Sequence, residues 1–347
     1  MKNLKLYFHK LFHWEYWSFE AIYIPLSLVW VYYALRAKSF FFFNASNPTI
    51  KNGGFLMESK KDIYDMMPEK YYPKTLFFTP NSNFLSIIEK INEKKIFFPL
   101  IAKPDIGMKG LAVEKINNEN ELKIYLSKIK VDFLIQELID LPNEIGVFYY
   151  RIPNQNKGHI SGIVHKELLT LVGNGVDTMI NLIKKNPRFY LQLSVLQKKY
   201  GEILSEILPN NQIFNLVPYG NHARGAKFID TTHWKNEKLN EMIDRICQEI
   251  PHFYYGRLDI KYNTLEELEC GENFSIIELN GAGSEPTHIY DPKHSIFWAW
   301  KEIIKHWHLL FRISTDNYKK GFPYLSFSEG MKMIKDNKNL VQKLKQF

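Results

Sequence analysis

Two neighbouring apolar segments carry polar side chains where a strand would normally be apolar. GRLDI carries Asp259, and the later segment IIELN carries Glu278 and Asn280. Residues two apart on a strand leave the same face, and a short connection favours an antiparallel pair, so three oxygen donors would come together. Burying such groups without a partner is costly. The alternative is that these two later side chains face water while Ile277 and Leu279 face the core.

This oxygen-rich set suits Mg²⁺, which prefers carboxylate and amide oxygens and keeps positions open for phosphate and water. Arg257 precedes Asp259 by two residues, so its side chain shares that face and could stabilise a transferring phosphoryl group. The sequence therefore predicts a magnesium site at Asp259, Glu278 and Asn280, with Arg257 beside it.

A glycine-rich loop occurs earlier, in IAKPDIGMKGLAV. It places Lys103 at a strand end and Lys109 between Gly107 and Gly110. Glycines let backbone amides approach phosphate oxygens, and lysine supplies a compact positive charge. The Walker ending is missing. As an isolated pattern, the loop is better explained as a hairpin turn with surface lysines.

The next segment is LIQELIDLPNEIGVFYYR, an apolar strand ending in Gln136 and Glu137, with Glu144 further on. A strand that leaves its sheet exposes backbone groups that can pair with an adenine edge, and a nearby carboxylate can accept both ribose hydroxyls. The alternative is a strand followed by solvated acids. Tyr149 and Arg151 are expected in or near the same pocket.

Helical and strand-type patterns alternate along the chain. Helical spacing is found at 83–94, 117–130, 176–204, 237–250 and 294–307, and strand-type runs at 95–104, 111–113, 131–139, 144–153, 157–169, 253–263 and 274–280. With 347 residues, 45% of them apolar, the chain can bury the cores of two or three subdomains.

The net charge of +8 favours an anionic partner, such as a nucleotide, a phosphate-bearing substrate or an acidic membrane surface. Cys247 and Cys270 have no metal-ligand spacing. No secretory signal is readable. These features fit a cytoplasmic protein, either free or attached peripherally to the inner face of the membrane. No nucleic-acid partner is expected.

The aromatic, apolar run at residues 19–35 leaves three alternatives open. Its length is at the lower limit for a bilayer span, and Pro25 would kink a helix. Its tryptophans and tyrosines resemble the aromatic belt at lipid headgroups. The run is therefore a membrane-surface element, a full span, or a buried helix followed by a core strand at 39–46. The basic tail at 332–345 is either a membrane-surface helix or a solvated one.

Together these motifs resemble the ATP-grasp superfamily over about residues 76–295, nearest the branch that includes D-alanine–D-alanine ligase. Residues 173–183 also resemble an element of cyanophycin-synthetase-like ligases, with Asn174 in place of an aspartate. The resemblance implies an α+β, ATP-grasp fold in which two α+β subdomains, 76–140 and 141–325, clasp ATP. They would follow an aromatic, basic N-terminal segment, 1–75, and precede the basic tail, 326–347.

The resemblance also implies roles for individual residues. Phosphate contacts would come from Lys103, the loop at 105–110 and a second lysine, Lys166. The adenine hinge would consist of Gln136, Glu137, Leu138 and Ile139, with Glu144 at the ribose. Two Mg²⁺ ions, with Mn²⁺ as an alternative, would bind at the predicted oxygen site. The N-terminal segment departs from the family's usual substrate domain, so a peptidoglycan substrate is not implied.

The expected activity is ATP-dependent activation of a carboxylate as an acylphosphate, which an amine or thiol then attacks. The alternatives are a kinase of the same superfamily and a non-catalytic nucleotide-binding protein. In YGNHARGAKFID, Arg224 can hold a substrate carboxylate bidentately or contact a phosphate, and the alternative is that it belongs to an ordinary surface loop. The amides of Gly283 and Ser284 could bind an acylphosphate oxyanion. His288 is either a base or a structural histidine.

Overall fold

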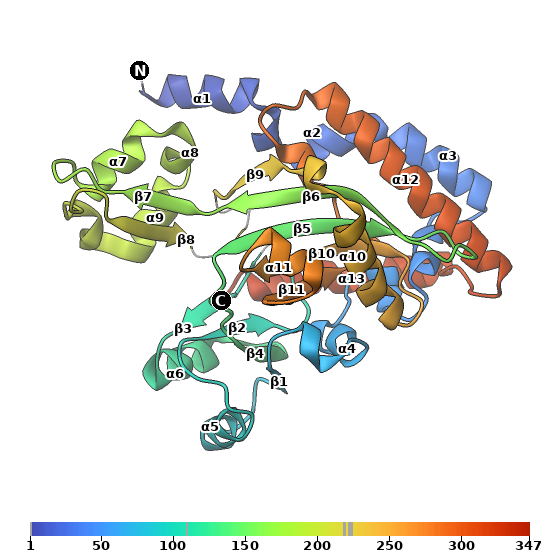
Figure 1. The fold of residues 1–347 in the computed structure, drawn as a ribbon, viewed down its shortest axis with the longest axis horizontal. Helices are drawn as coiled ribbons and strands as arrows, with labels where there is room; N and C mark the ends of the chain where they lie inside the picture. The colour runs from blue at the N-terminus through green and yellow to red at the C-terminus, as the bar shows by residue number, and fades with distance from the viewer. Residues whose placement is uncertain (1, 109, 218–219, 221–224) are drawn as a thin grey trace.

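A computed structural model describes residues 2–108, 110–217, 220 and 225–347. The fold is a mixed α and β arrangement with three antiparallel sheets (Figure 1). The α+β class that the sequence resemblance implies is therefore confirmed.

The first sheet, sheet A, has the strand order β1-β4-β2-β3. Its strands are β1 (Thr75–Phe78), β2 (Leu100–Pro104), β3 (Glu114–Ile116) and β4 (Phe133–Glu137). Helices α5 (Phe84–Glu93) and α6 (Glu119–Lys128) contribute Ile87, Leu122 and Tyr125 to a core shared with the sheet. Residues 111–113, expected to be a strand, form a turn, and β3 begins only at Glu114.

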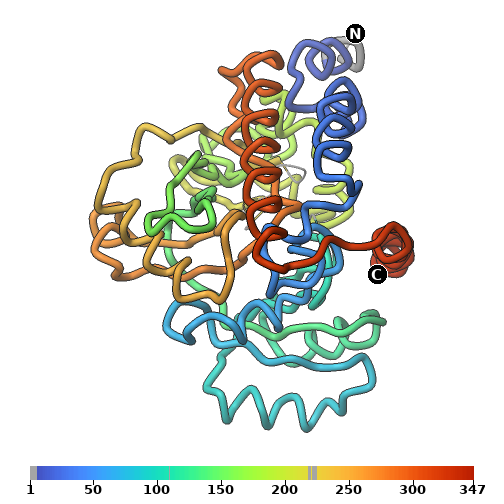
Figure 2. The backbone as a smooth tube through the Cα atoms, turned by 90° about the vertical axis from the view of Figure 1, so that its right-hand side faces the viewer, coloured from blue at the N-terminus to red at the C-terminus, as the bar shows by residue number. Residues whose placement is uncertain are grey.

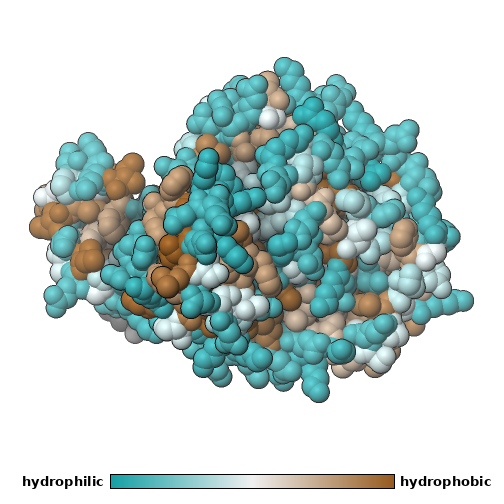
Figure 3. Space-filling view, turned by 90° about the horizontal axis from the view of Figure 1, so that it is seen from below, coloured by the Kyte–Doolittle hydropathy of each residue, from teal (hydrophilic) through white to brown (hydrophobic). Residues whose placement is uncertain are grey.

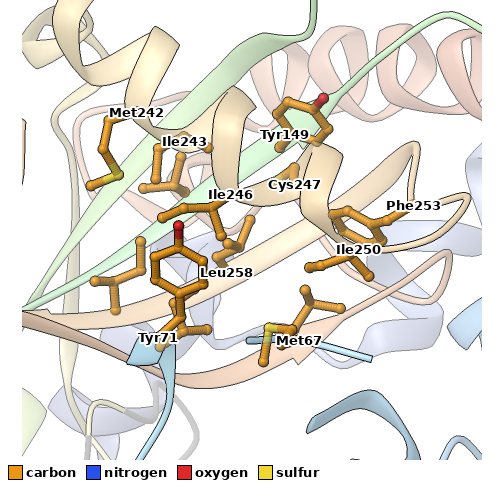
Figure 4. Packing of buried hydrophobic residues seen from close by; sticks show 14 of the residues in the cluster. Met67, Tyr71, Tyr149, Met242, Ile243, Ile246, Cys247, Ile250, Phe253 and Leu258 are labelled. Carbon is orange, nitrogen blue, oxygen red and sulfur yellow. The ribbon is translucent and has the colours of Figure 1, made fainter. Parts of the chain in front are cut away.

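The second sheet, sheet B, has the order β11-β10-β5-β6-β9. Its strands are β5 (Asn143–Tyr150), β6 (His159–Glu167), β9 (Lys227–Asp230), β10 (Tyr255–Tyr262) and β11 (Phe274–Asn280). Helix α10 (Glu237–Glu249) packs on one face, where Ile243 and Ile246 contact the same core as Leu258 (Figure 4). Tyr149 points into this core and donates to Asp244 Oδ1 at 2.7 Å. It therefore lies on the face opposite the polar residues described below, and not in a nucleotide pocket as expected.

The opposite face of sheet B carries polar side chains at the end near sheet A and aromatic side chains at its other end. Phe148 and Tyr255 join a core with Phe42, Phe43 and Phe311. Helix α12 (Ile296–Lys319) covers this aromatic end and lies beside α3 (Ser27–Ala37) (Figures 1 and 2).

The N-terminal apolar run is broken into short helices. They are α2 (Phe19–Tyr23), the 3-10 turn Ile24–Leu26 and α3, preceded by α1 (Lys2–Phe12). In the part of the chain that the structure describes, no helix is both long and apolar enough to cross a bilayer. The expected strand at 39–46 is wrong: Phe42–Ser46 is a 3-10 helix. Phe41, Phe42 and Phe43 are all buried, whereas a strand would turn every second side chain away.

The C-terminal tail forms α13 (Phe327–Leu344), in which Gly330, Met333 and Leu344 are buried, whereas Phe327, Met331 and Ile334 are exposed. Met333 joins the aromatic core, and Leu344 joins the core of sheet A. Gly330 lies so close to Phe41 that a Cβ would come within 2.3 Å of its ring. The tail therefore contacts both regions, while most of its residues stay exposed to solvent.

A small peripheral unit has its own core. It contains β7 (Leu169–Val172), β8 (Ile213–Val217), α7 (Met179–Lys185), α8 (Pro187–Tyr190) and α9 (Leu193–Tyr200). The helical stretch expected at 176–204 is thus divided, because Pro187 begins a new helix. Seen from below, this unit projects at the left of Figure 3 and shows apolar surface. Exposed apolar residues of the unit are Val172, Val176, Val195 and Ile213.

Candidate active site

The polar face of sheet B brings together the residues predicted at its last two strands. β10 and β11 are antiparallel neighbours, with Arg257 opposite Asn280 and Asp259 opposite Glu278. Leu258 and Leu279, which alternate with them, are buried in the core. The predicted pairing of these two strands, with the polar side chains on one face, is therefore confirmed.

Asp259 lies at the centre of a buried ion-pair network. Its Oδ1 is 2.9 Å from Arg257 Nε and 3.1 Å from Lys166 Nζ, and Lys166 Nζ is 2.8 Å from Glu144 Oε1. Burial alone would raise the pKa of Asp259, but Arg257 and Lys166 outweigh it and hold that pKa below its usual value. The carboxylate is therefore ionised at neutral pH, as a metal ligand must be.

Gly146 of β5 makes room for this network. It lies opposite Asp259, and a Cβ there would be 3.1 Å from Asp259 Oδ1 and 3.3 Å from Arg257 Cδ. A side chain at this position would push the carboxylate and the guanidinium apart. The absence of a side chain at Gly146 therefore allows the contact between Asp259 and Arg257. The sequence patterns did not predict this role.

Lys103 connects sheet A to sheet B. Its Nζ donates to Gln136 Oε1 at 2.8 Å, to the Tyr64 hydroxyl at 3.0 Å and to the carbonyl of Ile277 at 3.3 Å. Burial lowers the pKa of Lys103 to about 8. The lysine predicted to contact phosphate therefore faces the strand that carries Glu278.

The N-terminal segment adds residues that sequence reasoning missed. Helix α4 (Lys60–Asp65) places Lys60 Nζ 3.6 Å from Glu278 Oε1 and 3.3 Å from the carbonyl of Gly107. Asp105 accepts from the backbone of Lys61 at 2.8 Å. The glycine loop is therefore tied to α4, and no spacing in the sequence indicates that contact.

Glu58 stands out among these N-terminal residues. Its Oε2 is buried and has no hydrogen-bond partner among the described residues. Burial raises the pKa of Glu58, and Glu278 adds to that effect while Lys60 opposes it. A second carboxyl group therefore lies in the electrostatic field of Glu278.

The loop after β11 is held by a second glycine-rich turn. The amides of Ala282 and Gly283 donate to the carbonyls of Gly53 and Gly54, each at 2.9 Å. The Ser284 amide donates to Gly281 at 3.0 Å. The expectation that the Gly283 and Ser284 amides form an oxyanion site is therefore wrong, because backbone carbonyls already accept from both.

The predicted hinge joins the two sheets. β4 ends at Glu137, and residues 138–142 lead directly into β5. Gln136 is buried, whereas Glu137, Leu138 and Ile139 are partly exposed. The backbone amide of Glu137 donates to Lys74 at 2.9 Å. The adenine role of these residues remains a prediction.

Two predicted residues, Lys109 and Arg224, lie outside the described residues, as does His222. Gly220 is described, and a Cβ there would be 2.6 Å from Glu144 Oε1 and from Lys166 Cδ. The chain near Gly220 thus passes directly against the Lys166–Glu144 pair.

The donor set at the predicted metal site fits Mg²⁺. Asp259, Glu278 and Asn280 offer only oxygen ligands, and these are the donors that Mg²⁺ requires. Within the described residues, Asn280 Nδ2 is buried without a hydrogen-bond partner. Because amide nitrogen and oxygen are interchangeable by rotation, this side chain can present its oxygen to an ion.

No protein-family model and no curated protein matches the sequence. Similar solved structures include a bifunctional glutathione synthetase from Pasteurella multocida, at 15% identity and TM-score 0.38, covering 75% of this chain and 38% of that one. VanG D-Ala:D-Ser ligase from Enterococcus faecalis has 12% identity and TM-score 0.43, covering 75% and 63%. D-alanine–D-alanine ligase from Bacillus anthracis has 14% identity and TM-score 0.45, covering 78% and 71%.

The chain thus spans less than two thirds of the first two of these proteins. At these TM-scores, the similarities assign no role to any residue of this chain.

Proposed function

We propose that the protein is an ATP- and Mg²⁺-dependent ligase that activates a carboxylate as an acylphosphate for attack by an amine or thiol. The observation that supports this most is the convergence of cations from two sheets on one set of oxygen donors. Lys103 comes from sheet A, and Lys166 and Arg257 come from sheet B. Such a set can hold a polyphosphate and its metal together.

Phosphate binding would rearrange the ion pairs of the network. Lys166 and Arg257 now bind the carboxylates of Glu144 and Asp259. An incoming triphosphate would take over these cations, leaving Asp259, Glu278 and Asn280 to hold Mg²⁺, which neutralises phosphate charge when bound. Released from Lys166, Glu144 would be free to accept ribose hydroxyls, the role that the sequence resemblance implies.

The chemistry needs two displacements. An oxygen of the substrate carboxylate attacks the γ-phosphorus, the bond to the β-phosphate oxygen breaks, and ADP leaves. The amine or thiol then attacks the acyl carbon, the acyl–oxygen bond breaks, phosphate leaves, and the nucleophile loses its proton. We assign to Arg257, which is mostly buried beside Asp259, the role of stabilising the charge that develops on the transferred phosphoryl group.

Product analysis separates this ligase from a kinase and from a binding-only protein. The full-length protein is incubated with Mg·ATP, hydroxylamine and a panel of amino acids and hydroxy acids. The ligase predicts ADP, phosphate and a hydroxamate that depends on one class of carboxylate. A stable phosphorylated product would establish the kinase instead, and no ATP turnover would favour the non-catalytic alternative.

The matched variants are Glu278→Gln and Lys198→Ala. Lys198 is an exposed lysine on α9 in the peripheral unit. Turnover should disappear in the first variant and persist in the second. Equal turnover in both would refute the metal assignment.

We further propose that the N-terminal helices lie on an anionic membrane surface on the cytoplasmic side. Ile24 of the 3-10 turn is exposed, and so are Leu28, Val31 and Leu35 along α3, Leu28 at 80% and Leu35 at 74%. The opposite face, including Ile22 and Leu26, packs in a core shared with α12. Basic residues flank this segment in the sequence: Lys10, Arg36 and Lys38 are exposed. Apolar contact area flanked by cations is what binds a helix to acidic lipid.

Liposome flotation tests this surface. The protein should float with vesicles containing anionic phospholipid and not with purely zwitterionic vesicles. Leu28→Glu and Leu35→Glu should abolish flotation. Val195→Glu and Ile213→Glu, at similarly exposed apolar positions of the peripheral unit, should leave flotation unchanged. Flotation of neither preparation, or equal loss in all four variants, would refute the proposal.

A further inference from the structure

Three metal-ligand side chains gather at the aromatic end of sheet B, away from the predicted Mg²⁺ ligands. His288 belongs to the 3-10 helix η9 (Thr287–Tyr290), and Glu302 and His306 belong to α12. Residues four apart on a helix share a face, and this face of α12 contacts η9. The potential ligand atoms of the three side chains lie within 4.8 Å of one another.

The two distances between the carboxylate and the imidazoles are close to those of a coordination shell and longer than ordinary hydrogen bonds. Glu302 Oε1 is 3.6 Å from His288 Nε2 and 3.4 Å from His306 Nε2. Hydrogen bonds between nitrogen and oxygen are usually about 2.7–3.2 Å long. In a tetrahedron whose ligands lie about 2.0–2.1 Å from a zinc ion, neighbouring ligand atoms are about 3.3 Å apart.

His306 is buried without a hydrogen-bond partner. Its side chain is 1% exposed, and neither ring nitrogen has a partner among the described residues. An unsatisfied buried polar group costs about 1–3 kcal/mol. A ligand at the ring nitrogen would remove that cost.

The surroundings hold the histidines in place. A Cβ on Gly162 would be 2.3 Å from two ring atoms of His288, so only glycine leaves room for this imidazole. Phe148 meets the His306 ring edge-on, with centroids 4.4 Å apart, and Trp298 meets His288 in the same way at 5.9 Å. The two imidazoles are therefore positioned before any ion arrives, which lowers the entropic cost of binding.

Lys305 is the present counterion of the carboxylate. Its Nζ lies 2.8 Å from Glu302 Oε1, but the side chain is 54% exposed. A long, half-exposed lysine can swing into solvent at little cost. A divalent cation would therefore compete with Lys305 for the same oxygen.

We propose that His288, Glu302 and His306 bind a zinc-type divalent ion, with water completing a tetrahedral shell. Two imidazoles and one carboxylate form a set that suits zinc, whereas the all-oxygen set at Asp259 suits Mg²⁺. The bound ion would fix η9 to α12 and so hold the loop that follows Asn280. The proposal does not depend on the proposed ligase activity.

Direct metal measurement tests the site. Full-length protein is stripped with a zinc-selective chelator in excess Mg²⁺ and then titrated with Zn²⁺ against a colorimetric indicator. One equivalent should bind, and Co²⁺ should give the visible absorption of a tetrahedral complex. Because loss of an outer-sphere partner alone costs about 10–100-fold in affinity, His306→Ala should weaken Zn²⁺ binding at least about 100-fold.

Two variants guard against misfolding and nonspecific binding. Lys305→Met, which removes the competing cation, should bind Zn²⁺ more tightly than wild type. His233→Gln changes an exposed histidine and should bind as wild type does. No stoichiometric Zn²⁺ binding, equal binding in His306→Ala and wild type, or weaker binding in Lys305→Met would overturn the proposal.

Discussion

Lys103 of sheet A donates to the carbonyl oxygen of Ile277 in sheet B at 3.3 Å. The Tyr64 hydroxyl from the N-terminal segment donates to the same oxygen at 2.6 Å. Three parts of the chain therefore meet at the residue that precedes Glu278. Because Lys103 is a buried cation at the junction of the two sheets, we expect this junction to bind an anion.

Replacing Lys103 with methionine should weaken ATP binding while the protein still folds. Lys103→Met keeps a long side chain in the buried position but removes the charge, so ATP affinity should fall at least about tenfold, the equivalent of one charge-assisted hydrogen bond. Isothermal titration with a nonhydrolysable ATP analogue measures this. Lys198→Ala is the control, and wild-type affinity in Lys103→Met would contradict the role of Lys103.

The lowered pKa of Lys103 predicts a specific pH dependence of stability. Burial lowers its folded-state pKa to about 8, against about 10.4 in an unfolded chain. Below pH 8 both states are protonated and the cost of burial is constant. As pH rises from about 8 to 10.4, the folded state releases the proton first, so the free energy of unfolding increases by up to about 3 kcal/mol. Denaturation of wild type and Lys103→Met across this range should show the rise only in wild type.

ATP affinity should respond to pH in the opposite direction. Phosphate favours the charged lysine, so binding in this range requires uptake of a proton. Above pH 8, the affinity of wild type should therefore fall by up to about tenfold per pH unit. A flat profile between pH 8 and 9.5 would contradict the contact between Lys103 and phosphate.

Neutralising Asp259 should reduce folding stability much more than neutralising Glu278. Asp259→Asn leaves Arg257 and Lys166 with a single buried counterion, Glu144, and should cost about 3–5 kcal/mol of stability. Glu278 is 34% exposed, so Glu278→Gln should change stability by less than about 1 kcal/mol. Both should abolish Mg²⁺-dependent turnover. Urea denaturation beside ATPase assays distinguishes the two effects, and equal destabilisation would contradict the described network.

Gly54 should tolerate no side chain. Its φ is +73°, and a Cβ would lie 2.7 Å from Gly281 Cα in the loop after β11. Gly201 also has a positive φ, +54°, but a Cβ there would meet nothing within 4 Å. Gly201→Ala should cost about 1–2 kcal/mol from backbone strain alone. Gly54→Ala should cost more and also reduce turnover, and a similar melting temperature for the two would contradict the close approach.

The local sequence pattern predicted much of sheet B, but it predicted little of the N-terminal segment that packs against β11. The alternation in IIELN and GRLDI was enough to predict the strand pair and its polar face, because side-chain direction on a strand depends only on position. Lys60 and Tyr64 could not be predicted. They reach the site through a tertiary contact between α4 and β11, and no periodicity encodes such a contact.

The errors have a common physical cause. Phe41, Phe42 and Phe43 have strong strand propensity, but burial on all sides favoured a 3-10 turn over a pleated strand. The lysine-rich tail forms the helix that its pattern predicted, but the pattern did not predict that Leu344 and Met333 pack into two different cores. In both cases tertiary packing decided the outcome.

Binding of a nonhydrolysable ATP analogue, with and without Mg²⁺, tests the central claim most directly. Wild type and Lys198→Ala should bind the analogue, and Mg²⁺ should tighten that binding. Glu278→Gln should retain its fold and lose at least about tenfold of the Mg²⁺ effect. No binding by wild type, or the same Mg²⁺ effect in Glu278→Gln, would contradict a Mg·ATP pocket between the two sheets.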